Sequence, residues 1–310
     1  MSILAIILPV IGLIAVGWLA QKTRLVSRAA EEGLTEYVFS IAVPALIVLT
    51  LTKDFDSADF SWAYLVAYFS GVAVAWLAGM LLATRLGNGT WKESVLFGFV
   101  SAQSNTVLLG IPLIIRVYGD AAAMPMFLLL AVHLPIMMTA VTLMVEGPTS
   151  GTGLRTQFAK IGGSLIRNPI VVAMIVGLFL KLTGLTPGGI LATLLEGIGK
   201  TTATCALLAM GMSLARYNLV RGLTSGLMLS LVKLVIHPLA VWVLAFKLFG
   251  LPPVVGGVAV IYAALPSGIN SYLVAKRYGA AEMEVSATII LATLLSVVSL
   301  FLWLSFLNAQ

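Results

Sequence analysis

Two polar strings interrupt apolar segments about 160 positions apart, and they hold most of the residues that could bind a small molecule. The first is SAQSNTVLLGIPLIIRVYG, residues 101–119, and the second is AALPSGINSYLVAKRYG, residues 263–279. Pro and Gly interrupt helices and so leave backbone groups free, and the amides of Asn105 and Asn270 can add directional hydrogen bonds. Because a free helix N-terminus carries partial positive charge, this chemistry suits a carboxylate.

The candidate site residues are of two kinds. Those expected to contact a substrate are Gln103, Ser104, Asn105, Thr106, Lys233, Ser267, Asn270 and Ser271. Those expected to break the two helices are Gly110, Pro112, Pro266 and Gly268. Pro112 removes an amide donor and disfavours helical angles at the preceding residue, so free backbone groups are expected over residues 105–112. The hydroxyls and amides can either bind substrate or satisfy that freed backbone, and both interpretations stay open.

Three ionisable residues lie inside apolar segments, where they are costly and therefore candidates for function. Lys233 lies ~18 Å along a helix from Arg221 at 1.5 Å per residue, and His237 follows on the same face. Lys233 either neutralises an anion or replaces a coupling cation; otherwise it extends its ammonium toward the membrane surface or is hydrogen-bonded to carbonyls freed by Pro238. His133 is interpreted as a packing residue, and His237 is left unassigned.

The sequence contains no pattern typical of a metal site, a cofactor site or an enzyme. Acidic residues are almost absent from the expected membrane centre, which argues against a carboxylate-based sodium or proton site. The single cysteine, Cys205, has no metal-type spacing with either histidine. No HExxH or GxSxG string accompanies His133 and His237, so an intramembrane enzyme is disfavoured. We therefore expect no cofactor and no metal.

The composition places the chain in a lipid bilayer. It is 60% hydrophobic and 10% charged, with a mean hydropathy of +1.07, values that exclude a water-soluble globular domain of this length. A spanning helix needs about 20 mainly apolar residues. Ten stretches qualify once interruptions are allowed, near residues 2–20, 34–52, 62–84, 94–116, 122–145, 161–182, 190–214, 222–248, 254–276 and 282–307.

The distribution of charge predicts the orientation of these helices. Lys and Arg are concentrated in the odd-numbered loops, beginning with Lys22, Arg24 and Arg28, so these loops are expected in the cytoplasm and both termini outside. The net charge of +6 reflects largely this loop bias, and no nucleic acid is expected as a partner.

A constant shift of 160 residues indicates an internal duplication. It brings Pro9 onto Pro169, Gly17 onto Gly177, and Tyr118-Gly119 onto Tyr278-Gly279. We predict an all-α membrane protein of two five-helix repeats, residues 1–146 and 161–310, joined by a cytoplasmic linker over 147–160. Five crossings per repeat is an odd number, so the second repeat is inverted, and the broken fourth and ninth helices run antiparallel with their breaks near the midplane.

The strings SNTVLLGIPL and ALPSGINSYLVAKRYG resemble the signature segments of the auxin efflux carrier family, in its bacterial branch related to the plant PIN-formed proteins. The resemblance covers nearly the whole chain. It implies a sodium/proton antiporter-like fold in which helices 1, 2, 6 and 7 form a scaffold, while helices 3–5 and 8–10 form a transport domain. It also implies a homodimer through the scaffold, an elevator-like movement, a crossover marked by Pro112 and Pro266, and site amides at Asn105 and Asn270.

The resulting expectation is a secondary transporter of a small organic anion, an auxin-like or dicarboxylic acid, in a bacterial inner membrane. A sodium-coupled symporter of the same fold is the near alternative. A passive anion channel is a third, because broken helices also line pores.

Overall fold

The computed structural model describes residues 3–52, 62–86, 89–147, 168–216 and 222–308, and helix is the only extended regular structure within them. The elements are α1 (Ile3–Lys22), α2 (Arg28–Tyr37), η1 (Val38–Ala42), α3 (Val43–Leu51), α4 (Trp62–Leu86), α5 (Trp91–Ala102), η2 (Thr106–Gly110), α6 (Ile111–Tyr118), η3 (Gly119–Ala122), α7 (Ala123–Glu146), α9 (Pro169–Thr183), α10 (Gly189–Leu214), α11 (Leu223–Leu231), η4 (Val232–Ile236), α12 (His237–Trp242), η5 (Val243–Leu248), α13 (Pro253–Ala264), α14 (Asn270–Tyr278) and α15 (Glu282–Asn308). Helices therefore lie in all ten predicted segments.

The described residues form a multi-pass membrane protein. Six helical stretches are long and apolar enough to cross a membrane: Ile3–Lys22, Arg28–Leu51, Trp62–Leu86, Thr106–Glu146, Leu223–Leu248 and Glu282–Asn308. Pro169–Thr183 and Pro253–Ala264 are apolar but shorter. Ten crossings in two inverted repeats stays a prediction. Three predicted features lie outside the described residues: the linker after its first residue, the start of the sixth span, and Arg221.

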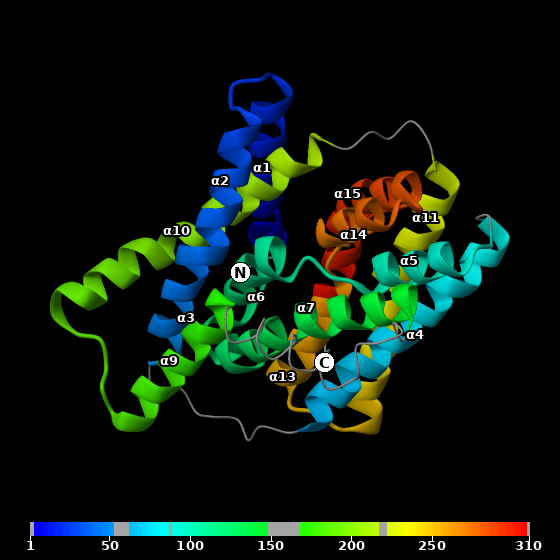
Figure 1. Ribbon diagram of the computed structural model, residues 1–310. Coiled ribbons are helices and arrows are strands. Elements are labelled where there is room, and N and C mark those ends of the chain that lie inside the picture. Colours follow the sequence, from blue (N-terminus) through cyan, green and yellow to red (C-terminus); the bar gives the residue numbers. More distant parts are fainter. Residues whose placement is uncertain (1–2, 53–61, 87–88, 148–167, 217–221, 309–310) are drawn as a thin grey trace.

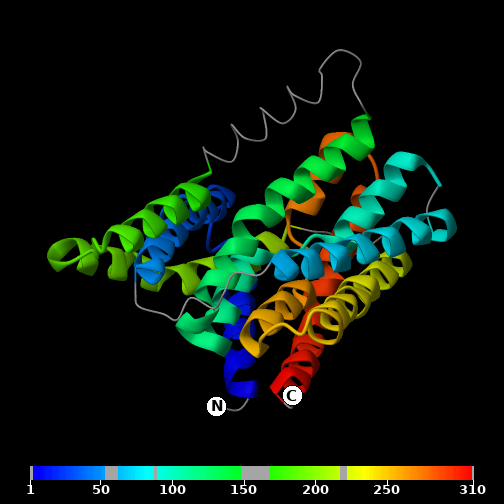
Figure 2. The same cartoon turned by 90° about the horizontal axis from the view of Figure 1, so that it is seen from below.

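The helices pack in two groups (Figures 1 and 2). In one group α10 packs against α1, α2 and α3, and α9 packs against α3. In the other group α4 packs against α5, α11 against α15, and α13 against α12, α4 and α15. Helices α6 and α7 contact elements of both groups. Residues far apart in the sequence are thus brought together at the boundary between the groups.

Glycines allow the closest helix packing in the first group. A Cβ atom at Gly17 of α1 would overlap the backbone of Leu208 in α10, and one at Gly177 of α9 would press on Leu51 of α3. These two glycines are the pair related by the shift of 160 residues. The structure thus packs α1 on α10 and α9 on α3.

Helices α5 and α13 form the centre of the second group. Every residue of α5 from Glu93 to Ala102 and every residue of α13 from Gly256 to Ala264 is buried. A helix that is buried on all sides is expected in the interior of a large bundle rather than at its surface. These two helices are also the ones that lead into the polar strings, so both breaks lie at the centre of the protein.

Three of the four π-turns precede a proline at the same spacing. The N–H groups of Val43, Ile111 and His237 each bond to the carbonyl five residues earlier, and Pro44, Pro112 and Pro238 follow directly. Proline has no N–H and its ring clashes with the carbonyl four residues before it. Widening the preceding turn relieves that clash while the rest of the helix continues.

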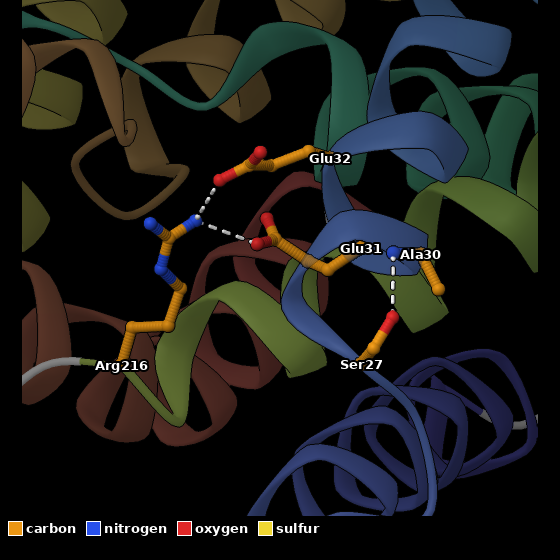
Figure 3. A network of polar contacts seen from close by, with 5 residues as sticks. All are labelled: Ser27, Ala30, Glu31, Glu32 and Arg216. Carbon is orange, nitrogen blue, oxygen red and sulfur yellow. Dashed lines mark hydrogen bonds and ion pairs between the residues drawn. The ribbon is translucent and has the colours of Figure 1, made fainter.

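An ion pair fastens the end of α10 to the start of α2 (Figure 3). Arg216 Nη1 lies 2.7 Å from Glu31 Oε2 and 3.3 Å from Glu32 Oε1. The Ser27 hydroxyl caps α2 by accepting a hydrogen bond from the Ala30 N–H at 3.2 Å. Because the Glu31 side chain is only 3% exposed, its pair with Arg216 is better shielded from water than an ordinary surface ion pair.

The packing of α10 on α1 generates a stability prediction. A methyl group at Gly211 would overlap the carbonyl oxygen of Ile14, whereas one at Gly197 on the same helix would meet no atom within 4 Å. Gly211→Ala is expected to destabilise the fold by roughly 1–3 kcal/mol. Gly197→Ala is expected to be neutral or stabilising, since Ala favours helix over Gly. Thermal unfolding of both purified variants measures this, and equal midpoints would contradict the packing described.

Candidate functional site at the crossing of two broken helices

The two helix breaks cross each other. Helix α5 ends at Ala102, and the chain is extended at Gln103 before η2 begins at Thr106. Helix α13 ends at Ala264, and the chain is extended at Leu265 before α14 begins at Asn270. Ser104 and Ser267 form an isolated antiparallel bridge, and the Asn105 N–H donates to the Pro266 carbonyl at 3.0 Å. The two polar strings therefore meet, as their sequences predict.

Groups from other segments satisfy the backbone carbonyls that the breaks leave free. In a continuous helix the Val100 carbonyl would accept from Ser104 and the Ala263 carbonyl from Ser267. Instead, the Ser267 hydroxyl donates to the Val100 carbonyl at 2.6 Å, and Lys233 Nζ donates to the Ala263 carbonyl at 2.5 Å. Ser267 thus performs the backbone-satisfying role that the sequence left as one of two possibilities.

Gln103 connects the first break to the second. Its Oε1 accepts a hydrogen bond from the Gly268 N–H at 2.9 Å. A Cβ atom at Gly268 would approach this same oxygen within 2.5 Å. Gly268 therefore allows a close approach of backbone to side chain, and the bond fixes the two extended segments relative to each other.

The Lys233 ammonium is completely buried and has three acceptors. Nζ lies 2.9 Å from Ser104 Oγ, 3.1 Å from His237 Nδ1 and 2.5 Å from the Ala263 carbonyl. These three acceptors match the three donors of an ammonium group. None of them is a carboxylate, so the positive charge is hydrogen-bonded without being neutralised.

Both histidines lie at this network. The Ser104 N–H, freed by the first break, points to His133 Nε2 at 3.4 Å, and His133 Nδ1 lies 3.2 Å from the Tyr68 hydroxyl. His133 is therefore a satisfied interior histidine. His237 accepts from Lys233 through Nδ1, which leaves the proton on Nε2. That nitrogen is buried and has no partner among the described residues.

A cavity of about 730 Å³ lies beside the crossing. Six of the predicted site residues line it: Gln103, Ser104, Asn105, Thr106, Gly268 and Asn270. No hydrogen bond within the described part of the chain occupies the side-chain amides of Asn105 and Asn270. Both amides are thus available to a ligand. The half-helices η2 and α14 begin at the cavity wall, where the positive ends of their dipoles favour an anion.

The remaining predicted residues lie outside the cavity wall. Lys233 and Ser267 are behind it and bond to the breaks, as described. Ser271 is buried, and its hydroxyl has no partner within the described residues. Among the described residues, none that lines the cavity is acidic, and no group of three His, Cys, Asp or Glu could hold a metal ion.

The expected positions of Pro112 and Gly110 require correction. The non-helical part of the first string ends at Asn105, and Pro112 follows the π-turn η2 within a helix that continues into α6. Gly110 lies in the π-turn and packs against Tyr262 of α13, where a Cβ atom would come within 2.8 Å of the ring. Only Pro266 lies in an extended break. Pro112 therefore shapes the π-turn after the crossing and does not mark the crossing itself.

The sequence as a whole matches a known family. The model of the family described as "Membrane transport protein" covers residues 2–304. The chain belongs to this family. It is the auxin efflux carrier family that the two polar strings resemble, and its members are transporters rather than enzymes.

Two similar proteins cover nearly the same length. A protein of Rhizobium meliloti (strain 1021) with the description "Putative malonate transporter" is 28% identical over 307 residues, 96% of this chain and 93% of its own. An "Uncharacterized transporter" of Methanothermobacter thermautotrophicus is 24% identical over 305 residues, 96% of each chain. Both share the transporter description.

Sequence reasoning missed the opposite wall of the cavity. This wall consists of Phe39 and Ser40 in η1, Leu130 and Leu134 in α7, and Asn168, Pro169 and Ile170 at the start of α9. One signal was available, because Asn before Pro is a typical helix start: the Asn168 side chain accepts from the Ile170 N–H at 2.9 Å. Ser40 carries no local signal, because a single Ser in an apolar helix is common.

The hydrogen bond from Ser267 to Val100 generates a prediction about stability. Ser267→Ala leaves a buried carbonyl unsatisfied, which costs about 1–3 kcal/mol. The unfolding midpoint should fall. Ser305→Ala, which removes a hydroxyl bonded to the Phe301 carbonyl within a continuous helix, is the matched control. An unchanged midpoint for Ser267→Ala would show that the bond does not hold the breaks together.

Proposed function

We propose that this protein is a secondary transporter that binds a small organic anion in the cavity at the crossing of the broken helices. The observation that carries the proposal is the polarity of that cavity. Its described wall has the side-chain amides of Asn105 and Asn270 and the N-termini of two half-helices, and none of the described residues that line it is a carboxylate. The buried Lys233 ammonium lies directly behind it and bonds to Ser104. All these features favour negative charge.

A small carboxylate is the substrate class that fits best. Ligand pockets commonly measure about 300–1,000 Å³, so the cavity of about 730 Å³ has room for a short dicarboxylate with water, or for a larger aromatic acid. Phe39, Leu130 and Leu134 supply apolar surface on one side. The description of the Rhizobium meliloti relative makes malonate the first compound to test.

The position of the cavity supports an elevator-type mechanism. One wall comes from η1 and α9 in the first group of helices, and the other from the crossing in the second group. A shift of one group against the other would carry the crossing and its anion across the membrane. In this proposal the ten predicted segments are numbered in chain order. Segments 1, 2, 6 and 7 form the scaffold, and segments 3–5 and 8–10 form the transport domain. Both domains contain segments from both inverted repeats.

The same proposal includes a homodimer in a bacterial inner membrane with both termini outside. Apolar side chains on α9 and α10, among them Leu182 at 78% and Ile190 at 81% exposed, leave this side of the scaffold free to contact lipid or a second copy. Helix α1 begins and α15 ends on the same side of the molecule, which agrees with an even number of crossings (Figure 2).

Sodium-coupled symport of the same anion is the alternative. The observation in its favour is the Ser271 hydroxyl, which is buried without a partner among the described residues and follows the cavity residue Asn270. A hydroxyl together with backbone carbonyls can bind sodium without a carboxylate. The absence of acidic side chains from the cavity wall favours the uncoupled carrier.

Currents in proteoliposomes on a solid-supported membrane test the proposal. Malonate and a panel of mono- and dicarboxylates are applied with sodium and with choline. We expect a current that saturates with malonate concentration and persists in choline. A current that requires sodium would establish the symporter. A flux that does not saturate would establish a channel, and the lack of any current across the panel would refute carboxylate transport.

Substitution of the free amides tests the site. Asn105→Ala and Asn270→Ala should each weaken malonate binding about tenfold or more, because a hydrogen bond to a charged group contributes about 1.5–3 kcal/mol. The amount of folded protein should change little, since neither amide bonds to the rest of the described chain. Asn308→Ala on the exposed end of α15 is the control. Wild-type affinity in Asn105→Ala, measured by binding of labelled malonate, would remove Asn105 from the site.

A further inference from the structure

The Lys233 ammonium bridges the two helix breaks. One acceptor, Ser104 Oγ, belongs to the first break, and another, the Ala263 carbonyl, belongs to the last turn before the second break. The third acceptor, His237 Nδ1, lies one turn further along the same segment as Lys233. A single positive group is thus surrounded by neutral lone pairs from three parts of the protein.

The three acceptors around Lys233 Nζ resemble the ligands around a bound monovalent cation. The distances from Nζ to the two oxygens and the nitrogen are 2.5, 2.9 and 3.1 Å. An ammonium ion and an alkali metal ion both bind to hydroxyl and carbonyl oxygens, and here the ammonium is covalently attached to the chain. It therefore supplies a fixed charge at the crossing that needs no ion from solution.

Lys233 lies behind the cavity wall rather than in it. Its side chain is 0% exposed, and it is absent from the wall of the cavity. Ser104 lies between them, because its hydroxyl accepts from Lys233 and it also lines the cavity. Lys233 is therefore a positioning residue, which fixes Ser104 and adds a positive field to the adjacent cavity.

Buried carboxylates lie elsewhere in the described chain. They are Glu31 and Glu93, both in the first turns of their helices, α2 and α5. Glu31 is paired with Arg216, and Glu93 lies a whole helix length, about 15 Å at 1.5 Å per residue, before the first break. Neither bonds to Lys233, so none of the hydrogen-bond partners of Lys233 in the described chain is a carboxylate.

We propose that the Lys233 ammonium takes the place of a coupling cation, so that an anion binds at the crossing without sodium, and that removal of this ammonium makes binding depend on an added monovalent cation. The proposal rests on the proposed function for the identity of the anion. It goes further in assigning the mode of coupling to one residue.

Lys233→Met is the variant that isolates the charge. Methionine matches lysine in length as far as Cε and lacks Nζ, so it leaves the oxygens of Ser104 and Ala263 around a gap of about one atom. Lys247→Met is the matched control, because Lys247 lies on the same segment, is exposed, and its ammonium lies 5.3 Å from the centre of the Trp242 ring. Its loss removes one positive charge without altering the crossing.

Binding of labelled malonate to purified protein in choline, sodium and potassium chloride is the first measurement. We expect wild type and Lys247→Met to bind equally in all three salts. Lys233→Met should bind at least about tenfold more weakly in choline, a loss of about 1.4 kcal/mol, and recover in sodium or potassium. Unchanged binding of Lys233→Met in choline would refute the proposal, as would a loss that no cation restores or a wild type that requires sodium.

Thermal unfolding without malonate is the second measurement, and it does not depend on the substrate. A cation that binds only the folded state raises its stability. Sodium or potassium should therefore raise the midpoint of Lys233→Met by about 2 °C relative to choline and leave wild type and Lys247→Met unchanged. Equal midpoints in all salts for Lys233→Met would overturn the proposal. If malonate fails to bind wild type, the proposed substrate class is wrong, while these midpoints still decide the role of Lys233.

A second variant covers the case in which Lys233→Met does not fold. Lys233→Gln keeps a donor for the Ala263 carbonyl and removes the charge. The same salt series applies to it, with the same expected recovery in sodium or potassium. Folded protein that binds malonate equally in choline and sodium would refute the proposal for this variant too.

Discussion

Unpaired backbone groups in a membrane interior are the constraint on which the rest of this structure depends. Each break in a buried helix frees N–H and carbonyl groups that lipid cannot satisfy. In this protein the two breaks satisfy one another, through Ser267 and the Val100 carbonyl and through the Asn105 N–H and the Pro266 carbonyl. Neither break would be stable alone, so their crossing is a single structural unit.

This mutual satisfaction separates the polar residues into two sets. One set bonds to backbone groups that the breaks leave free, and it consists of Ser267, Lys233 and His133. The amides of Asn105 and Asn270 are not used in this way and line the cavity. The first set holds the half-helices in place, which keeps their N-termini directed at the cavity, and the second set is left for a ligand. The free binding groups therefore lie in the two short strings, while the groups that hold the breaks come from the strings and from two neighbouring helices.

The sequence predicted the helices and the meeting of the two strings, because apolar length and clustered Pro, Gly and Asn are local signals. It misjudged Pro112, since a π-turn before a proline lets the helix continue, and only the geometry of that turn decides whether a proline breaks a helix. The contact of Lys233 with both breaks and the contribution of Ser40 to the cavity depend on how distant helices pack. Such contacts leave no trace in the order of residues along one chain.

The π-turns before Pro44, Pro112 and Pro238 have a consequence for comparison with relatives. Each such turn accommodates about one residue more than an α-helical turn and rotates everything after it about the helix axis. A relative that lacks the proline can lose that residue and keep the same buried face. Single-residue gaps in alignments of this family are therefore expected inside these membrane helices, next to residues such as Thr106 and Lys233, and they should not be moved into the loops.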